Sequence, residues 1–514
     1  MQKLVSVPEM IAIEKAANAA GHTYAKMIAH AGASLAKQVL AHSHGRGRSV
    51  LGLVGPGNNG GDTLVALDLM STQGWNSVVY VVGERASKDE FIRRVKASGC
   101  EILFASDDPA FDKLKALVVE YHVLLDGLLG TGIKLPLREP SANALIAVNE
   151  TLAALSEKPL VVAVDCPSGM DVETGELAPQ TLKADLTVCM AAVKRGMLTM
   201  PAFESLGEVA VGDIGLPDDL LEWGRIRRFV INEEMARAAL PPRPADAHKG
   251  TFGTALIVAG SRRFPGAAFL AGEAAYRSGT GLVTIATVES VQPSLAGSLP
   301  EATWLPLTEK DGWIAAEAVT QLLAILDKAT AVLFGPGFGQ EEQTGGFLSE
   351  LLKNTLPPLV ADADALKLIA AMKGGVMNLP KDSVLTPHPG EMAILTGLDI
   401  SEIQGARLET AEKFAREWQQ VVVLKGAFTA VASFDGQSAI LPVASAALAR
   451  AGSGDVLAGI IAGLRAQGVE AYEAACTGVW LHGQAGLRAA KRLSGTAGVL
   501  AGDLIKELPA LIGQ

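Results

Sequence analysis

Cysteine is scarce in this chain of 514 residues, and its four cysteines lie far apart. Cys100, Cys166, Cys189 and Cys476 form no Cys-x-x-Cys pair. This spacing supports neither a disulfide framework nor a thiolate metal site. We therefore expect all four thiols to be buried and to pack like small apolar side chains.

Long apolar runs are absent as well. The longest stretch without Asp, Glu, Lys or Arg is 15 residues, Leu69 to Gly83, and polar residues interrupt it. A membrane-spanning helix needs about 20 apolar residues, so we expect none. Near the N-terminus, Lys3, Glu9 and Glu14 break the apolar stretch that a signal peptide requires. These features predict a cytoplasmic protein that does not associate with membranes.

Positive charge is in deficit, because 44 Lys and Arg against 55 Asp and Glu give a net charge of −11. Such a surface repels phosphate backbones, and we expect no nucleic-acid partner. Hydrophobic residues make up 49% of the chain and charged residues 19%, which excludes a disordered composition. We expect packed cores throughout, with a homo-oligomer as the default assembly.

What the chain does contain is a repeated alternation of short apolar runs with longer Ala-rich amphipathic stretches. This pattern is typical of parallel sheets flanked by helices, and it predicts an α/β fold in both halves. A charged stretch followed by Pro241, Pro242 and Pro244 separates the halves. We place the boundary near residue 225, giving domains 1–225 and 226–514. The expected strands are Val50–Val54, Val78–Val82, Glu101–Phe104, Val123–Asp126 and Leu160–Asp165, then Thr254–Ala259, Leu282–Ala286, Ala331–Phe334, Leu359–Asp362 and Val421–Lys425.

The first candidate site starts at a glycine-rich turn. The segment Gly55–Gly61 leads from an expected strand into an expected helix, so free backbone amides can gather there around an anion. Such turns also serve plain packing. Asn58, Asn59 and Asp62 add two amides and a carboxylate, which exceeds what a tight turn needs and favours a ligand role.

Two more expected strands in this half end in an aspartate. Asp126 precedes Gly130–Gly132, and Asp165 precedes Pro167–Gly169. Either aspartate alone could cap a helix or form a turn. Ligands in open parallel sheets bind outside the carboxyl ends of the strands, so the three loops together predict one site.

The motifs GPGNNGGD, DGLLGTG and DCPSG resemble the YjeF N-terminal epimerase domain, which acts on hydrated nicotinamide dinucleotides, over about residues 1–225. The resemblance implies a Rossmann-like three-layer αβα sandwich in which Asp165 contacts the substrate and is the candidate acid/base. Thr63 stands where the family usually has glycine. Implied substrate contacts are Asn58, Asn59, Gly60, Gly61, Asp62, Gly130, Thr131, Gly132, Ile133, Lys134, Leu135, Pro136 and Asp165, and implied potassium ligands are Asn59, Asp126 and Ser168.

The second candidate site lies near the other end of the chain. Gly452-Ser453-Gly454-Asp455 opens an apolar helix, where the small residues let backbone amides face a phosphoryl group. Asp455 could equally be an ordinary cap. His388 stands between two prolines directly after a strand, a position that favours a functional role over a structural one.

Together with HKGTFGTALIVAGS, LFGPGFG, ADADAL, LTPHPGEM and VVVLKGAFT, this segment resembles the ribokinase-like dehydratase domain that acts on the same hydrated dinucleotides, over about 240–514. The resemblance implies a ribokinase-like αβα domain with ADP and magnesium as cofactors. Ala446–Arg450 replaces the family's usual Asn-Pro-Gly-Met stretch, and Arg450 could supply a phosphate-binding charge. Implied substrate contacts are Gly253, Gly337, His388 and Asp455, and implied nucleotide contacts are Lys425, Gly426, Ala427, Phe428, Thr429 and Gly454.

The two resemblances imply one bifunctional enzyme that repairs hydrated NADH and NADPH. One half would interconvert the R and S epimers, and the other would dehydrate the S form while ADP becomes AMP and phosphate. Asp455 would be the general base for phosphoryl transfer to the substrate hydroxyl. The alternative is a small-molecule kinase, for a vitamin precursor or sugar, fused to a nucleotide-binding module that lacks epimerase activity.

Overall fold

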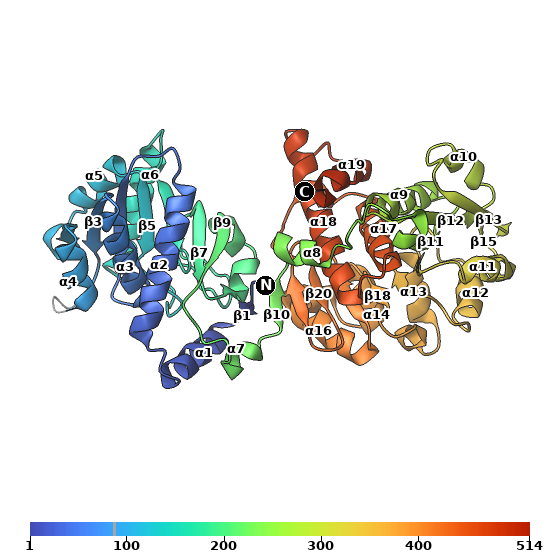
Figure 1. Ribbon diagram of the computed structural model, residues 1–514, viewed down its shortest axis with the longest axis horizontal. Helices are drawn as coiled ribbons and strands as arrows, with labels where there is room; N and C mark the ends of the chain where they lie inside the picture. Colours follow the sequence, from blue (N-terminus) through green and yellow to red (C-terminus); the bar gives the residue numbers. More distant parts are fainter. Residues whose placement is uncertain (86–88, 514) are drawn as a thin grey trace. The chain divides into compact units, whose positions relative to one another are not determined.

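The computed structural model describes residues 1–85 and 89–513 and divides the chain into two compact units (Figure 1). One unit is Gln2–Arg227, and the other is Arg228–Gln514 with Met1. Both units contain a mostly parallel sheet covered by helices, which confirms the predicted α/β class. Each of the ten predicted strands is present, with ends shifted by at most two residues. All four cysteines are free and buried, as expected.

The N-terminal unit is built on a seven-stranded parallel sheet in the order β4-β3-β2-β5-β6-β7-β9. A short parallel pair, β1 (Leu4–Val5) with β8 (Val193–Lys194), lies apart from it. The strands are β2 (Ser49–Val54), β3 (Asn76–Val81), β4 (Glu101–Phe104), β5 (Val123–Gly127), β6 (Leu160–Val164), β7 (Leu186–Met190) and β9 (Glu208–Gly212). The helices are α1 (Val7–Ala19), α2 (Tyr24–His42), α3 (Asn58–Thr72), α4 (Glu90–Ala97), α5 (Asp112–Glu120), α6 (Ser141–Ala154) and α7 (Leu221–Gly224).

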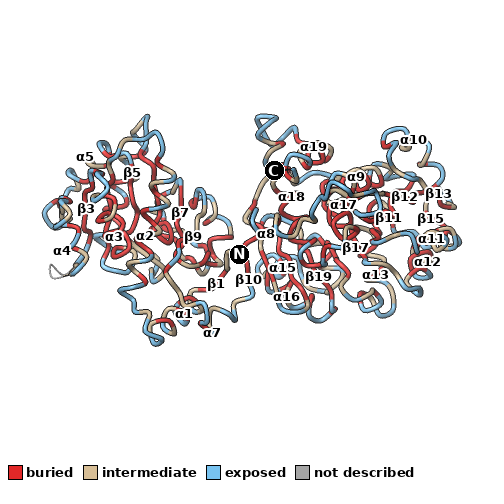
Figure 2. Tube along the Cα trace, viewed as in Figure 1, coloured by how far each residue is buried: buried red, intermediate tan, exposed pale blue. Residues whose placement is uncertain are grey.

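Alternate residues of these strands pack into two separate cores. Val50 and Val54 of β2 face the cluster formed with α1 to α4, whereas Leu51 and Leu53 face the cluster formed with α5 and α6. Successive side chains of a strand point to opposite faces, so a sheet covered on both sides needs apolar residues at nearly every position. Figure 2 shows the buried positions running along the strands and the helix faces turned toward them.

The C-terminal unit has a ten-stranded sheet in the order β10-β21-β20-β19-β18-β17-β16-β11-β12-β13. Only β20 runs against the others, pairing antiparallel with both neighbours. The strands are β10 (Arg228–Val230), β11 (Thr254–Val258), β12 (Leu282–Val288), β13 (Thr303–Leu307), β16 (Ala331–Phe334), β17 (Leu359–Ala361), β18 (Val384–Leu385), β19 (Val421–Leu424), β20 (Ala430–Ala432) and β21 (Ser438–Ile440), and a small hairpin pairs β14 (Glu309–Lys310) with β15 (Trp313–Ile314).

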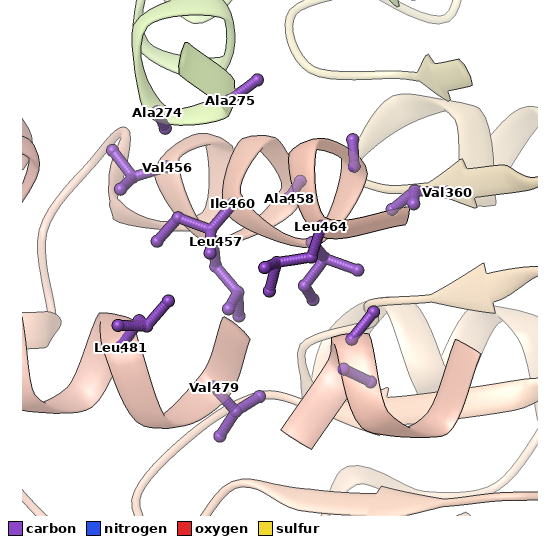
Figure 3. Packing of buried hydrophobic residues seen from close by; sticks show 14 of the residues in the cluster. Ala274, Ala275, Val360, Val456, Leu457, Ala458, Ile460, Leu464, Val479 and Leu481 are labelled. Atoms are coloured by element: carbon purple, nitrogen blue, oxygen red, sulfur yellow. The ribbon is translucent and has the colours of Figure 1, made fainter. Parts of the chain in front are cut away.

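Helix α17 (Ser453–Ala466) is the centre of this unit's main core. It packs between α9 (Pro265–Arg277) and α18 (Ala471–Arg492), with Val456, Leu457 and Ile460 among the buried side chains (Figure 3). The remaining helices are α8 (Glu233–Ala239), α10 (Gln292–Ala296), α11 (Val319–Leu326), α12 (Glu342–Leu351), α13 (Asp364–Ala371), α14 (Pro389–Thr396), α15 (Ile400–Gly405), α16 (Arg407–Trp418) and α19 (Ala501–Ile512).

The strand order places one switch point in each sheet. The chain proceeds outward from β2 through β3 and β4, then returns to β5 on the other side of β2. In the second sheet it proceeds from β11 through β12 and β13, then returns to β16 on the other side of β11. Ligands of open α/β sheets bind at such switch points, outside the carboxyl ends of the strands. Both sites predicted from the sequence include loops at these positions.

No helix within 1–85 and 89–513 has the length and apolar character required to cross a membrane.

Candidate active sites

A cavity of about 350 Å³ opens at the switch point of the N-terminal sheet. Its lining includes Asn58, Asn59 and Asp62 from the start of α3, Gly130–Ile133 from the loop after β5, and Asp165 from the end of β6. The structure therefore brings together the three loops that the sequence singled out. Gly60 and Gly61 lie within the same turn without lining the cavity, and Lys134, Leu135 and Pro136 lie beyond its lining residues.

Asp165 forms a buried ion pair with Lys194, a residue that sequence reasoning missed. Lys194 is 1% exposed and also donates to the carbonyl of Met190 at 3.1 Å. Burial alone would lower the pKa of Lys194, but the Asp165 carboxylate holds it above its ordinary value. Lys194 ends the two-residue strand β8 and lies outside any recognisable motif, so only the fold shows that it lies in this site.

Two further carboxyl groups face the same cavity. Burial, followed by repulsion from Asp165, raises the pKa of Glu14 and raises that of Asp62 well above its ordinary value. Glu14 was also missed, because its position on α1 looks like an ordinary amphipathic helix. The cavity thus contains an ion-paired carboxylate and two carboxyls that retain protons more readily than usual.

Of the three residues with predicted potassium-ligand roles, Asn59 lines this cavity, whereas Asp126 and Ser168 are not among its lining residues. Asp126 accepts hydrogen bonds from the Ser168 amide at 2.7 Å and the Ser168 hydroxyl at 2.5 Å, and both residues are fully buried. The Ser168 hydroxyl accepts from the Leu129 amide at 2.9 Å, and Asn59 donates to the Leu129 carbonyl at 3.2 Å. Burial raises the pKa of Asp126 to about 6. Among residues 1–85 and 89–513, no cationic side chain affects the pKa of Asp126. A fully buried carboxylate without a counter-charge suits a bound cation.

Thr63 does not line the cavity. Its hydroxyl donates to the Asn59 carbonyl at 2.7 Å, one turn earlier in α3. Its side chain lies against Gly127, where an added Cβ would come within 1.8 Å of the Thr63 oxygen. Thr63 therefore fills space behind the loop and leaves the residues that face the cavity in place.

In the C-terminal unit, Asp455, Lys425 and Asp362 meet at the start of α17. The Lys425 ammonium lies 2.6 Å from one Asp362 oxygen and 3.9 Å from Glu391. A Cβ added at Gly454 would lie 3.3 Å from that ammonium. Burial and then the Asp362 charge raise the pKa of Asp455 to about 7, which suits a general base near neutral pH.

His388 caps helix α14 beside this cluster. Its Nδ1 accepts from the amides of Gly390 and Glu391 at 3.0 and 3.3 Å, and its Nε2 lies 3.3 Å from the Glu391 carboxylate. Half of its side chain is exposed, so it can reach a ligand. Asp362 belongs to the motif ADADAL and Glu391 to LTPHPGEM. The sequence pointed to both motifs but did not identify these two carboxylates as site residues.

Lys425–Thr429 forms a closed turn after β19. The Thr429 hydroxyl donates to the Gly426 carbonyl at 2.8 Å, and the Phe428 amide donates to Val443. Arg407, at the start of α16, donates to the carbonyls of Leu424 and Lys425 at 2.9 and 3.0 Å and supports the turn from below. The sequence offered Arg450 as a charge for binding phosphate. In the structure its guanidinium donates a hydrogen bond to the Ala497 carbonyl.

Gly337 and Gly253 occupy opposite ends of the sheet. Gly337 follows β16 at the switch point, and its carbonyl accepts from the Ser261 hydroxyl at 2.7 Å. Gly253 precedes β11, and a Cβ there would lie 1.8 Å from the carbonyl of Ala466, the last residue of α17. Asp455 lies near the start of α17 and Ala466 ends it, so about 16 Å of helix separates Asp455 from the residue against which Gly253 packs. The structure does not bring Gly253 into the site.

Two parallel-sheet domains, each with ionisable side chains gathered at or beside its switch point, define a two-domain α/β enzyme. A family model described as NAD(P)H-hydrate dehydratase matches residues 255–510, and the model of the YjeF-related protein N-terminus matches residues 24–196. The bifunctional NAD(P)H-hydrate repair enzyme Nnr of Moorella thermoacetica is 35% identical over 493 residues, covering 95% of this chain and 92% of its own. The chain belongs to the family of bifunctional NAD(P)H-hydrate repair enzymes.

Two further relatives illustrate the extent of the similarity. Nnr of Coxiella burnetii is 33% identical over 500 residues and covers 97% of both chains. A Bacillus subtilis ADP/ATP-dependent NAD(P)H-hydrate dehydratase, crystallised with ATP and Mg²⁺, is 38% identical with a TM-score of 0.47 and covers 55% of this chain and 96% of its own.

Proposed function

We propose that this protein repairs NADH and NADPH hydrated at the nicotinamide ring, with epimerisation in Gln2–Arg227 and nucleotide-dependent dehydration in Arg228–Gln514. The placement of Asp455 beside Lys425 and Asp362, at a phosphoryl-binding helix start, carries the proposal. The family membership decides against the alternative of a vitamin or sugar kinase. The cytoplasm, where reduced nicotinamide dinucleotides circulate, is the proposed location, and a homo-oligomer stays a prediction.

In the dehydratase half, the Asp455 carboxylate takes the proton from the hydroxyl on C6 of the substrate. The oxygen then attacks the terminal phosphoryl group of the nucleotide, and the proposed donor, ADP, becomes AMP. The C6–O bond breaks, phosphate leaves, and loss of the C5 proton forms the C5–C6 double bond. Lys425 and the amides at Gly454 stabilise the negative charge that phosphoryl transfer develops. His388 and Gly337 contact the substrate, and Lys425–Thr429 contacts the nucleotide.

Magnesium fits the side chains of this site. Asp362 Oδ2 is buried and has no hydrogen-bond partner in the described part of the chain. No group of three or more His, Cys, Asp or Glu that could hold a metal occurs within residues 1–85 and 89–513. Mg²⁺ is usually held by one or two carboxylates together with substrate phosphates, which suits Asp362 and Glu391. When bound, the ion would neutralise phosphate charge.

In the epimerase half, Lys194 holds the Asp165 carboxylate in place. A protonated carboxyl, Glu14 or Asp62, whose pKa values are raised, gives its proton to the C6 hydroxyl, and the C6–O bond breaks to release water while N1 supplies the electrons that form the N1=C6 bond. Asp165 takes a proton from a water that adds to the opposite face of C6, the new C6–O bond returns the electrons to N1, and the proton passes back to the carboxyl that gave one. Backbone amides at the start of α3 bind the substrate phosphates. Potassium, held by Asn59, Asp126 and Ser168, would neutralise the buried Asp126 charge.

The full chain tests this proposal with a mixture of R and S hydrates. With ADP, the mixture should convert completely to NAD(P)H, measured by the absorbance of the reduced nicotinamide ring. Without ADP, the epimers should interconvert with no NAD(P)H formed. Conversion of the nucleotide without appearance of NAD(P)H would contradict the proposal.

A further inference from the structure

The loop after β11 places two adjacent arginines beside two aromatic rings. Arg262, Arg263 and Phe264 are exposed, and Phe264 retains 45% of its accessible surface. The Phe264 ring lies 6.4 Å from that of Trp313, which comes from the β14–β15 hairpin. Such a large exposed apolar ring, next to cationic groups, is a surface that suits a flat anionic ligand.

The protein itself leaves both guanidinium groups available. Within the described residues, neither one forms an ion pair or a hydrogen bond with a protein side chain, and the Arg263 guanidinium lies 5.8 Å from the Phe264 ring centre. The Arg262 amide, in contrast, donates to the Gly312 carbonyl at 2.9 Å and so fixes the loop to the hairpin. The backbone is anchored while both charges remain free for a ligand.

This cluster lies at the switch point of the C-terminal sheet, on the side of Gly337. The Gly260 amide donates to the Pro336 carbonyl at 2.7 Å, which joins the loop after β11 to the loop after β16. Gly337 has a φ of +69°, and an added Cβ would lie 2.9 Å from Phe264. The aromatic and arginine cluster is therefore continuous with the proposed substrate contact at Gly337.

The arginine and aromatic cluster is offset from the reacting end along the axis of α9. A Cβ added at Gly452 would lie 2.6 Å from Leu270, which follows Phe264 by six residues along α9. Six residues of helix span about 9 Å. A substrate with its nicotinamide ring near Asp455 can thus extend along the end of α9 and place its adenosine end beside Arg262 and Arg263.

We propose that Arg262 and Arg263 bind the 2′-phosphate of NADPH hydrate in the dehydratase site, with the adenine on the Phe264 and Trp313 rings, and that they make this half prefer NADPH hydrate over NADH hydrate. This inference rests on the proposed function. Arginine binds phosphate through two parallel charge-assisted hydrogen bonds, and only the NADPH form carries the 2′-phosphate. The rings contact adenine in both substrates, so they contribute affinity without discrimination.

The test compares the KM of both hydrates in the full chain at saturating ADP. The double variant Arg262→Gln, Arg263→Gln should raise KM about tenfold for NADPH hydrate and less than threefold for NADH hydrate, with kcat nearly unchanged. Phe264→Leu should raise KM for both hydrates by similar factors. Arg277→Gln, at the other end of α9 where the arginine pairs with Glu273 at 3.8 Å, is the matched control and should change neither.

A binding measurement separates this inference from the proposed function. Adenosine 2′,5′-bisphosphate should bind the wild type, measured by calorimetry with ADP present, and its Kd should rise about tenfold in the double variant. Equal KM changes for the two hydrates, or an unchanged Kd, would overturn the inference while the repair activity of the wild type stood. Failure of the wild type to dehydrate either hydrate would overturn the proposed function instead.

Discussion

Lys194 and Asp165 form an ion pair in the wall of the N-terminal unit's cavity, with the two side chains 1% and 9% exposed. A second fixed contact orients each partner, since Asp165 accepts from the Met190 amide at 2.8 Å and Lys194 donates to the Met190 carbonyl. A buried pair of this kind is costly to form and strongly destabilising to break on one side only. Its place in a cavity wall points to orientation of a reactive carboxylate.

Lys194→Met should abolish epimerisation and lower the free energy of unfolding by about 3–5 kcal/mol, because Asp165 is left buried without a counter-charge. The double variant Lys194→Met, Asp165→Asn removes both charges and should recover most of the stability without recovering epimerisation. Denaturant unfolding and the rate of epimer interconversion measure the two effects. A double variant that regains activity would show that the pair is only structural.

The rate of dehydration should depend on pH through Asp455. The proposed base acts when ionised, and its pKa is raised to about 7, so kcat/KM should rise with pH and level off above about 7. Below this value the rate should fall about tenfold per pH unit. Asp455→Asn should lower the dehydration rate by about 10²–10⁴-fold, leave epimerisation intact and remove this pH limb. If the variant kept a fall in rate with the same midpoint near pH 7, that pH dependence would belong to a group other than Asp455.

Potassium should stabilise the protein in a pH-dependent way. The pKa of Asp126 is raised to about 6 in the folded state, so without a cation its contribution to stability is present below pH 4 and lost as pH rises through 6. Potassium binds the ionised carboxylate and should offset this loss. We expect the increase in Tm on adding K⁺ to be larger at pH 7.5 than at pH 5, and small in Ser168→Ala. Sodium at equal ionic strength is the control, and an equal effect of the two cations would contradict a potassium site.

Thr63→Gly should destabilise the N-terminal unit without increasing epimerisation. The substitution removes the hydrogen bond to Asn59, leaves a gap against Gly127 and adds glycine within a helix, at a total cost of about 1–3 kcal/mol. Thermal unfolding and the epimerisation rate check this together. A clear rise in the rate would show that the threonine restricts the loop after all.

Each unit should fold and act alone, because each has its own cores. A chain ending at Arg227 should interconvert the epimers without nucleotide, and a chain beginning at Arg228 should dehydrate one epimer only. An epimer mixture should stall at partial conversion with the second chain and reach completion when both are present. Rapid full conversion by the second chain alone would contradict the division of labour.

The sequence predicted the strands well because fully covered parallel strands are almost continuously apolar, as in β2 and β6. It also predicted which loops meet, since Gly-rich and acidic segments follow strands whose carboxyl ends share one edge of a sheet. Lys194, Glu14 and Arg407 could not be found in this way. Each lies outside a motif, and only the folded chain brings it to a site.

Gly253 is a residue that the motifs suggested and the fold does not bring to the site. Its segment resembles the dehydratase family, and a substrate contact was therefore expected. In the structure it lies at the amino end of β11 and packs against the end of α17. A glycine within a motif can serve packing as well as binding, and sequence alone does not separate the two. Once the fold is known, the end of the strand at which a glycine lies distinguishes a packing role from a binding role.

The strand β10 gives the order of synthesis a role in folding. It is the first element of the C-terminal unit to leave the ribosome, yet its parallel partner β21 pairs Arg228 with Ser438, about two hundred residues later in the chain. At translation rates of about 5–20 residues per second, β10 waits about 10–40 s for that partner. During this time the N-terminal unit has been synthesised completely and can fold. In the C-terminal unit, β10 still lacks its partner strand β21. A chain that begins after β10 would leave β21 as a permanently bare edge, which is a site for aggregation.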